Sequence, residues 1–247
     1  MEDAEYEVLR AQEDRYWWYL GLRRLALEGL LARLPADRPA RVLDLGCGTG
    51  GMLAALLGAL PHASLHGIDR HPLALRHAHA RGAGTLVRGT ADALPYPDAS
   101  FDAVLALDLF YIREVEEQRA LGEARRVLAP GGVLIVNLPA FELLRGEHDL
   151  AVHTRSRYTA RDLGQKLRGA GFEVLRLTYW NAILFPLLLL RRRLRRPTAG
   201  AAPRSDLAPL PGALNALFSG TLALERKLLA LVNLPFGSSV FAVARKA

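Results

Sequence analysis

A short glycine-rich segment, residues 41–51, has the residue types and spacing of a loop that binds a nucleotide-like ligand. Apolar residues at 42, 43 and 45 predict a buried strand, and the apolar run 52–57 predicts a helix directly after the glycines. In this arrangement backbone N–H groups face the ligand, and glycine is needed because a Cβ would hold the ligand off the backbone. Gly46, Gly48 and Gly51 also fit the general dinucleotide pattern, which alone is weak evidence.

Asp44 discriminates between the ligands that such a loop could hold. It stands two residues before the first glycine, where the chain leaves the expected sheet. A carboxylate there would repel the pyrophosphate of a nicotinamide dinucleotide but would hold a cationic ammonium. S-adenosylmethionine has no phosphate and carries both an ammonium and a sulfonium. The sequence therefore favours S-adenosylmethionine as the cofactor.

The elements around this loop alternate between strand and helix, which predicts a parallel sheet with right-handed crossovers. The expected fold is a Rossmann-like α/β domain with a seven-stranded sheet, helices on both faces and an antiparallel last strand. We expect strands at 41–45, 64–69, 85–88, 101–107, 133–137, 172–179 and 240–245. We divide the chain into an N-terminal helical lid (1–40), the cofactor-binding core (41–180), a helical insertion with a mobile linker (181–235) and the final strand (236–247).

Polar residues at the carboxyl ends of these strands suit a bound S-adenosylmethionine. Asp69 follows the glycine loop by about twenty residues, the place for a carboxylate that binds ribose hydroxyls, although it could also cap the next helix. In the loop 89–96, Asp92 could accept a hydrogen bond from the adenine amine. The candidate cofactor-binding residues are Asp44, Gly46, Cys47, Gly48, Gly50, Asp69, Arg70, Ala91, Asp92, Ala93 and Asp108.

Loops at the same strand ends carry groups that could align or activate a methyl acceptor. A sulfonium is already an activated electrophile, so a base is needed only for a hydroxyl or a protonated amine. The catalytic candidates are His153, Tyr158 and Asp108. Of these, the histidine has a suitable pKa range, but it could equally stabilise its loop. The candidate substrate-binding residues are Trp17, Tyr19, Tyr111, Asn137, His148 and Arg157.

Composition limits the class of protein. Cys47 is the only cysteine, which excludes a disulfide framework and a cysteine-based zinc site, and we expect no metal. The net charge of +7 is concentrated in six arginines within residues 191–204, whereas a nucleic-acid-binding domain would spread it over a surface. The acidic start lacks the pattern of a signal peptide, and no apolar run reaches the length of a membrane span. A cytoplasmic protein that does not bind nucleic acid fits these features.

Residues 182–196 place nine apolar residues directly before a cluster of arginines. Three interpretations remain open: a helix that packs its leucines on the domain and leaves its arginines in water, a homodimer contact shared with a helix at 212–232, or a peripheral contact with an anionic membrane surface. The last would place the protein at the inner membrane face.

Several motifs together resemble the class I S-adenosylmethionine-dependent methyltransferases, in particular a broad bacterial group called Methyltransf_11-like. They are Asp44-Leu45-Gly46-Cys47-Gly48-Thr49-Gly50, Asp69, and the segments 91–95, 126–132 and 170–172, which cover roughly residues 41–180. The resemblance implies methyl transfer to an oxygen or nitrogen of a small-molecule, sugar or lipid-linked acceptor. The alternative is a protein of this fold that binds S-adenosylmethionine or S-adenosylhomocysteine without turnover.

A narrower similarity connects the chain to methyltransferases encoded beside sugar and polysaccharide genes. It is carried by Tyr16-Trp17-Trp18-Tyr19 and by the segments 148–159, 181–186 and 234–237. The chain departs from its relatives at Phe110-Tyr111, where they commonly have Glu-His after the Asp-Leu of the fourth strand. An acid–base role of that pair is therefore not expected here.

Overall fold

Predominantly apolar strands build one mixed sheet in the order β3-β2-β1-β4-β5-β7-β6. The computed structural model describes residues 3–194 and 210–247. Its strands are β1 (Arg41–Leu45), β2 (Ser64–Asp69), β3 (Thr85–Arg88), β4 (Phe101–Leu107), β5 (Leu128–Pro139), β6 (Phe172–Trp180) and β7 (Ser239–Lys246). The first five are parallel, and β7 inserts antiparallel between β5 and β6. The expected fold class, with its antiparallel last strand, is confirmed.

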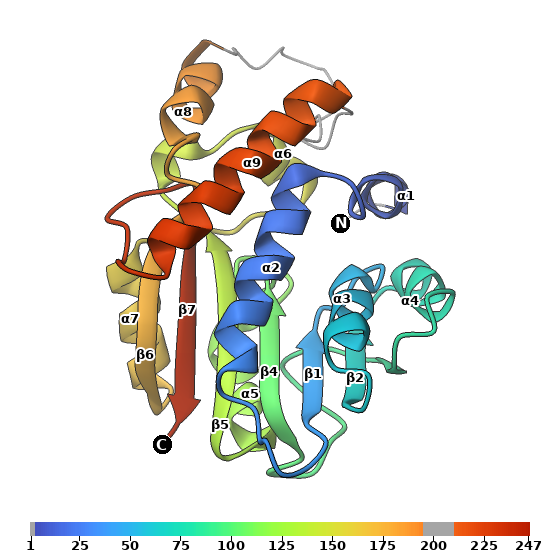
Figure 1. The fold of residues 1–247 in the computed structure, drawn as a ribbon. Coiled ribbons are helices and arrows are strands. Elements are labelled where there is room, and N and C mark those ends of the chain that lie inside the picture. Colours follow the sequence, from blue (N-terminus) through green and yellow to red (C-terminus); the bar gives the residue numbers. More distant parts are fainter. Residues whose placement is uncertain (1–2, 195–209) are drawn as a thin grey trace.

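Helices cover both faces of this sheet because its central strands are apolar on both sides (Figure 1). In β1, Val42 joins the core beneath one layer, whereas Leu43 and Leu45 join the core beneath the other. The first layer contains α2 (Trp17–Leu31), α3 (Gly51–Ala59) and α9 (Gly212–Leu229), and the second contains α5 (Glu117–Val127) and α7 (Ala160–Gly169). Next to β2 and β3 lies α4 (Pro72–His79).

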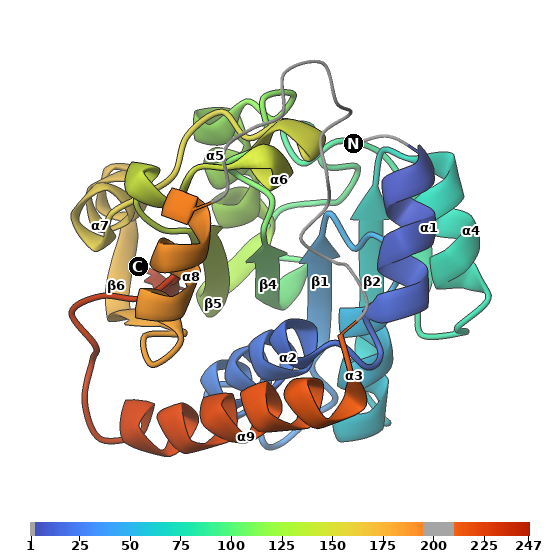
Figure 2. The same cartoon turned by 90° about the horizontal axis from the view of Figure 1, so that it is seen from above.

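The remaining short elements lie at the carboxyl ends of the strands (Figure 2). They are α1 (Asp3–Gln12), the 3₁₀ turn η1 (Glu142–Leu144), α6 (Glu147–Ala151) and α8 (Phe185–Leu194). In this view α1 and α8 lie at opposite ends of the same edge of the sheet. This edge includes the point between β1 and β4 where the strand order reverses, which is where ligands bind in open α/β sheets.

Part of the predicted N-terminal lid, residues 1–40, packs on the sheet instead of covering the strand ends. Of residues 1–40, α2 packs on the sheet through Leu25, Ala26 and Leu30, which are almost completely buried. The part that reaches the carboxyl ends of the strands consists of α1, the joint that leads into α2 and the first turns of α2. The linker predicted around 197–211 lies largely outside the described residues, as do Arg195 and Arg196. Among the helices of the described ranges, none has both the length and the hydropathy of a membrane span.

Candidate active site

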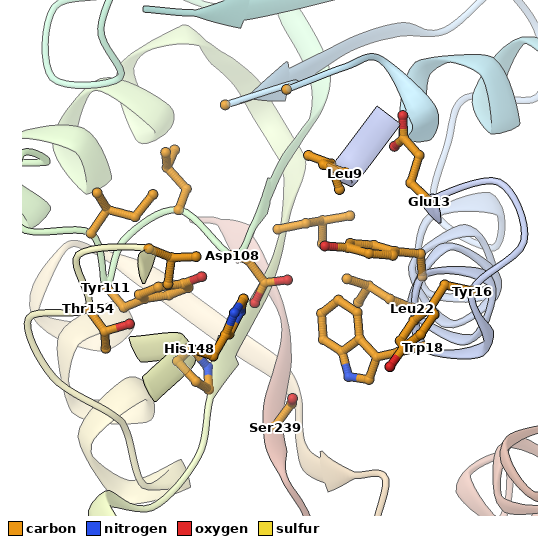
Figure 3. Close-up of a pocket in the computed structure, with 18 of the residues that line it drawn as sticks. Leu9, Glu13, Tyr16, Trp18, Leu22, Asp108, Tyr111, His148, Thr154 and Ser239 are labelled. Atoms are coloured by element: carbon orange, nitrogen blue, oxygen red, sulfur yellow. The ribbon is translucent and has the colours of Figure 1, made fainter. Parts of the chain in front are cut away.

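A cavity of about 340 Å³ opens at the carboxyl ends of β1, β2, β4 and β5. Asp44, Asp69 and Asp108 line it from three of these strand ends, together with the glycine loop. Figure 3 shows Asp108 between Tyr16, Trp18 and Leu22 on one side and Tyr111, His148 and Thr154 on the other. The cavity thus has an end at the glycine loop and an end enclosed by aromatic and polar side chains.

The turn between β1 and α3 can be made only by glycine. Gly46, Gly48 and Gly50 have φ angles of +69°, +52° and +82°, in the left-handed region that side chains disfavour. A Cβ on Gly46 would also lie 2.8 Å from Leu109 Cδ1, and one on Gly50 would lie 2.9 Å from the Ala78 Cα. The backbone can therefore approach a ligand closely at this end of the cavity.

Two carboxyl groups face that loop. Asp44 is only 3% exposed, and burial together with the nearby charge of Asp69 raises its pKa to about 8. The carboxylate of Asp69 accepts hydrogen bonds from the N–H groups of Gly48 (3.0 Å) and His71 (2.9 Å). These bonds fix the turn into α4, and the lone pairs that remain on the two oxygens are suited to the hydroxyls of a ribose. The N-cap of α4 is His71, so Asp69 supports the start of the helix without capping it, and its ribose role stays a prediction.

Asp108 occupies the centre of the cavity on a strained backbone. Its φ is +59°, rare for a residue with a side chain, and such strain is found most often at functional sites. The Asn137 amide donates to Asp108 Oδ1 (2.9 Å), and Asn137 Oδ1 accepts from the Trp180 indole (2.7 Å). Desolvation raises the pKa of Asp108 to about 7, against the lowering effects of Asn137 and Arg157. At that pKa the carboxyl group can act as a base near neutrality.

Comparison with known proteins agrees with this arrangement. Residues 42–132 match the family model of a methyltransferase domain. The chain is 42% identical over 103 residues to a demethylmenaquinone methyltransferase of Thermus thermophilus, covering 40% of this chain and 46% of that protein. It is 36% identical over 168 residues to a malonyl-[acyl-carrier protein] O-methyltransferase of Methylococcus capsulatus, covering 63% and 61%. Over these residues the chain is similar to the class I S-adenosylmethionine-dependent methyltransferases.

The curated relatives match over only part of their length, and one of the two solved structures matches at low sequence identity. The chain spans about half to three fifths of the length of these two relatives. Among solved structures, it resembles the [4+2]-cyclase SpnF (27% identity, TM-score 0.56, covering 91% of this chain and 79% of that one). It also resembles phosphoethanolamine N-methyltransferase 2 of Haemonchus contortus in complex with S-adenosyl-L-methionine (18% identity, TM-score 0.58, covering 90% and 52%). The second likeness concerns the fold alone.

The residues at the glycine end fit the family's cofactor, S-adenosylmethionine. A buried carboxyl group at Asp44 matches an ammonium, and the glycine turn allows close approach. Cys47 lines the cavity as well. Five other cofactor candidates do not line it: Gly50, Arg70, Ala91, Asp92 and Ala93. Gly50 instead makes the turn into α3, and the proposed adenine contacts of the loop 91–93 stay a prediction.

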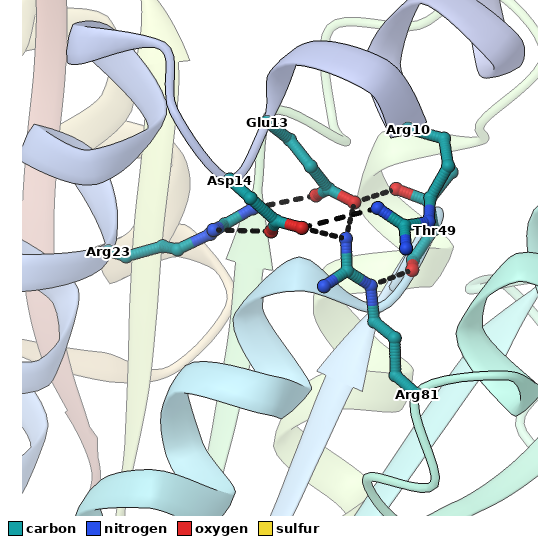
Figure 4. A network of polar contacts seen from close by, with 6 residues as sticks. All are labelled: Arg10, Glu13, Asp14, Arg23, Thr49 and Arg81. Atoms are coloured by element: carbon teal, nitrogen blue, oxygen red, sulfur yellow. Dashed lines mark hydrogen bonds and ion pairs between the residues drawn. The ribbon is translucent and has the colours of Figure 1, made fainter.

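An ionic network that the sequence did not reveal joins α1 and α2 to the glycine loop (Figure 4). Glu13, which is 5% exposed, accepts from the hydroxyl of Thr49, from Arg23 (2.7 Å) and from Arg81 (2.6 Å). Arg81 also donates to the Thr49 carbonyl (2.8 Å). Further along α1, the ring of Tyr6 stacks on His71. We call the contacts of Glu13 with Thr49, Arg23 and Arg81 the N-terminal clamp.

The four aromatic residues 16–19 all line the cavity, including the substrate-binding candidates Trp17 and Tyr19. Trp17 is buried against Phe218 of α9, with ring centroids 5.2 Å apart. Trp18 packs against Trp180, with centroids 5.5 Å apart. The aromatic cluster therefore serves both as core and as the boundary of the cavity.

The structure brings some acceptor-side candidates together and separates others. Tyr111, His148 and Arg157 line the cavity, and the guanidinium of Arg157 is paired with buried Asp149 (2.8 Å). Asn137 is completely buried and does not line it, so its position supports orienting Asp108 rather than touching substrate. The candidates therefore contribute in two ways, by lining the cavity and by supporting it from below.

Two catalytic candidates lie elsewhere. The Tyr158 hydroxyl is buried and donates to Glu117 Oε1 (3.0 Å), beneath α5. His153 Nδ1 lies 2.6 Å from Glu114 Oε1, and His153 does not line the cavity although its neighbours Val152 and Thr154 do. These contacts give both side chains structural partners, so their catalytic roles stay a prediction, and Asp108 is the base candidate that lines the cavity.

Helix α8 differs in part from the first interpretation of its sequence, in which the leucines pack on the domain and the arginines lie in water. Its outward side exposes Ile183 just before the helix, then Leu187, Leu190 and Leu194, at 48%, 51%, 54% and 73%. Arg191 and Arg192 are half-buried and line the cavity. The first interpretation therefore holds only in part: Leu188 and Leu189 are half-buried and Arg193 is exposed, but Arg191 and Arg192 turn inward.

Proposed function

We propose that the protein transfers the methyl group of S-adenosylmethionine to an oxygen or nitrogen atom of a small-molecule, sugar or lipid-linked acceptor. One observation carries the proposal: a single cavity connects the glycine loop and Asp44 to Asp108, whose pKa is raised to about 7. Cofactor and acceptor would therefore meet beside a group that can accept a proton. The methyltransferase relatives support the same reaction class.

In this mechanism the cofactor supplies an activated methyl group, and the residues of the chain align the acceptor. Asp44 holds the ammonium and Asp69 the ribose hydroxyls. Asp108, oriented by Asn137, takes the proton of the acceptor at its carboxylate. Trp18 and the other aromatic side chains exclude water from the cleft, which favours attack by the aligned acceptor.

The test is turnover with an acceptor panel. Radiolabelled S-adenosylmethionine would be incubated with demethylmenaquinone, a malonyl thioester, free sugars and polyprenyl-linked sugars, and S-adenosylhomocysteine would be quantified. We expect one acceptor class to produce S-adenosylhomocysteine, and Asp108→Asn to reduce the rate at least a hundredfold while cofactor affinity is retained.

A second candidate is a protein that binds the cofactor without methyl transfer. The likeness to a [4+2]-cyclase at 27% identity favours it, because that name shows that the fold serves other reactions as well. Tight binding of S-adenosylmethionine without any product across the panel would support this second candidate and contradict the first.

We also propose that the exposed apolar side of α8 rests on an anionic membrane surface at the cytoplasmic face. Leu187, Leu190 and Leu194 supply apolar area, and the exposed Arg193 supplies positive charge, worth about 1 kcal/mol near such a surface. The alternative is a homodimer through α9, which exposes Leu217 and Leu224 at 62% and 64%.

Flotation with vesicles containing phosphatidylglycerol separates these two contacts. The wild type should float at low salt, and the double variant Leu187→Gln/Leu190→Gln should not. Leu217→Gln/Leu224→Gln is the matched control, which should float normally. Sedimentation velocity of the same proteins detects a dimer. A wild type that stays in solution while the α9 variant dissociates a dimer would contradict the membrane proposal.

A further inference from the structure

Arg191 and Arg192 bring two positive charges to the acceptor side of the cavity. Both residues come from the last turn of α8, and both are half-buried although arginines at a helix end are usually solvated. The Arg192 guanidinium lies against Gly146, where an added Cβ would collide with it. Arg192 is thus held between α8 and the start of α6, at the wall of the cavity.

The same wall contains two buried polar atoms that lack a hydrogen-bond partner among the described residues. Thr154, 2% exposed, leaves its hydroxyl unpaired, and Asn181, completely buried, leaves Oδ1 unpaired. Both residues line the cavity, and Asn181 has a strained φ of +57° directly after β6. Orphaned buried polar groups cost free energy, so a water molecule or a polar ligand that bonds to them would stabilise the site. A hydroxyl can donate to an anionic oxygen, and an amide oxygen requires a donor such as a hydroxyl or an amine.

Charge is distributed unequally between the two ends of the cavity. The glycine end presents the carboxyl groups of Asp44 and Asp69. This end is complementary to the ammonium and sulfonium of the cofactor. The arginine pair enters at the other end, from α8, where it would attract an anion. Guanidinium groups are well suited to phosphate and carboxylate because they donate in parallel pairs.

We propose that the acceptor carries a phosphate or carboxylate group, held by Arg191 and Arg192, together with a hydroxyl or amine that reaches Asn181. This inference rests on the proposed function, since it names the substrate class of that same site. Methyl transfer would occur at another atom of the acceptor, near Asp108. The anionic group orients the molecule and takes no part in the chemistry.

Calorimetry on the protein saturated with S-adenosylhomocysteine tests the proposal. The probes are octyl phosphate, glucose 1-phosphate and, as the neutral reference, octyl glucoside, all below their micellar concentrations. We expect at least one phosphate to bind ten times more tightly than octyl glucoside. Arg191→Gln/Arg192→Gln should weaken phosphate binding by about tenfold to hundredfold.

Two matched variants sharpen the test. Arg193→Gln removes a charge from the same helix, but from its exposed side, and should leave phosphate affinity unchanged. Gly146→Ala keeps all charges but forces the Arg192 guanidinium to move, and its extended backbone (φ −158°) accepts alanine. It should cost a fewfold in phosphate affinity. A preference for octyl phosphate would identify a lipid-like acceptor, and a preference for glucose 1-phosphate a soluble one.

Two results would overturn the inference. One is octyl glucoside binding as tightly as both phosphates. The other is loss of S-adenosylmethionine affinity in Arg191→Gln/Arg192→Gln, which would assign the pair to the carboxylate of the cofactor. Failure of the wild type to bind S-adenosylmethionine at all would instead contradict the proposed function, so the two failures are distinguishable.

Discussion

Replacing Asp44 by asparagine should make the affinity for S-adenosylmethionine nearly independent of pH. In the free protein, burial and the charge of Asp69 raise the pKa of Asp44 to about 8, so the group is mostly protonated at neutrality. An ammonium placed against it favours the ionised form. Binding of S-adenosylmethionine should therefore release the proton of Asp44.

The size of the effect follows from that pKa. With a value of about 8, roughly one molecule in ten has an ionised Asp44 at pH 7, and roughly one in a hundred at pH 6. Each unit of acidification in this window should weaken cofactor binding about tenfold, or about 1.4 kcal/mol. The α-ammonium of the cofactor stays protonated in this window, because α-amino groups have pKa values of about 8.

Calorimetry at pH 6 and pH 7, in buffers of different ionisation enthalpy, measures both affinity and proton release. The wild type should release close to one proton per cofactor bound, and Asp44→Asn should release almost none and bind more weakly at pH 7. Asp98→Asn, which changes an exposed carboxylate away from the cavity, should behave as the wild type. A wild-type affinity that is flat between pH 6 and pH 7 would refute the role of Asp44.

The same pKa has a consequence for stability. A carboxyl group whose pKa is raised on folding stabilises the native state fully below its unfolded pKa near 4, and this contribution is lost as pH rises through about 8. Its upper bound is on the order of 5 kcal/mol. The melting temperature of the cofactor-free wild type should therefore fall from pH 5 to pH 8, and Asp44→Asn should fall less. Equal slopes in both proteins would contradict the buried position of this carboxyl group.

Three further changes test other parts of the site. Glu13→Gln weakens the N-terminal clamp and should expose residues 1–15 to protease. The docking of α1 on the domain should lose about 1–3 kcal/mol of free energy. Unchanged cleavage kinetics would show that the clamp is dispensable. Asp108→Asn should flatten the rise of kcat with pH around 7, and an unchanged pH profile would exclude it as the base. Gly46→Ala should weaken S-adenosylmethionine binding at least tenfold. Gly131→Ala should not, since Gly131 has a similar φ of +75° but lies in the irregular start of β5 with open space around it; equal effects would reduce the result to backbone strain.

The central strands could be predicted closely because each one ends in residues that the next element requires. β1 and β2 are short apolar runs that stop at a glycine turn or at Asp69. Both the apolar pattern and the residues that follow it therefore show where each strand ends. β5 was predicted to begin at 133, but it begins at Leu128 and includes the segment 129–132 that reads as a tight turn. Leu128 pairs with Phe101 before the register shifts, so the glycines form an irregularity within the strand. Residues 129–132 have no partner on β4 and Gly131 keeps a φ of +75°, so the local turn persists as a bulge inside the strand.

The cofactor side of the site was more predictable than the acceptor side, for a geometric reason. Asp44, Asp69 and Asp108 follow parallel strands, and parallel strands bring their carboxyl ends to one edge whatever the side chains do. His153 belongs to a loop whose path depends on η1 and α6, and neither element has a strong sequence signal. Glu13 meets Arg81 across 68 positions of sequence, and neither residue type by itself indicates a partner.

The sequence of α8 does not determine which side of the helix faces the rest of the protein. Its leucines and arginines occupy successive blocks of the sequence, so they do not alternate with the helical period and no face is favoured. The orientation is set by the rest of the fold: β6 ends at Trp180, and Glu225 of α9 accepts from the backbone N–H groups of Ala182 (2.7 Å) and Ile183 (2.9 Å), which fixes how the chain enters the helix. Because that entry is fixed, Arg191 and Arg192 face the cavity and Leu187 and Leu190 face outward. A carboxylate on a distant helix therefore decides which side of α8 is offered to an acceptor.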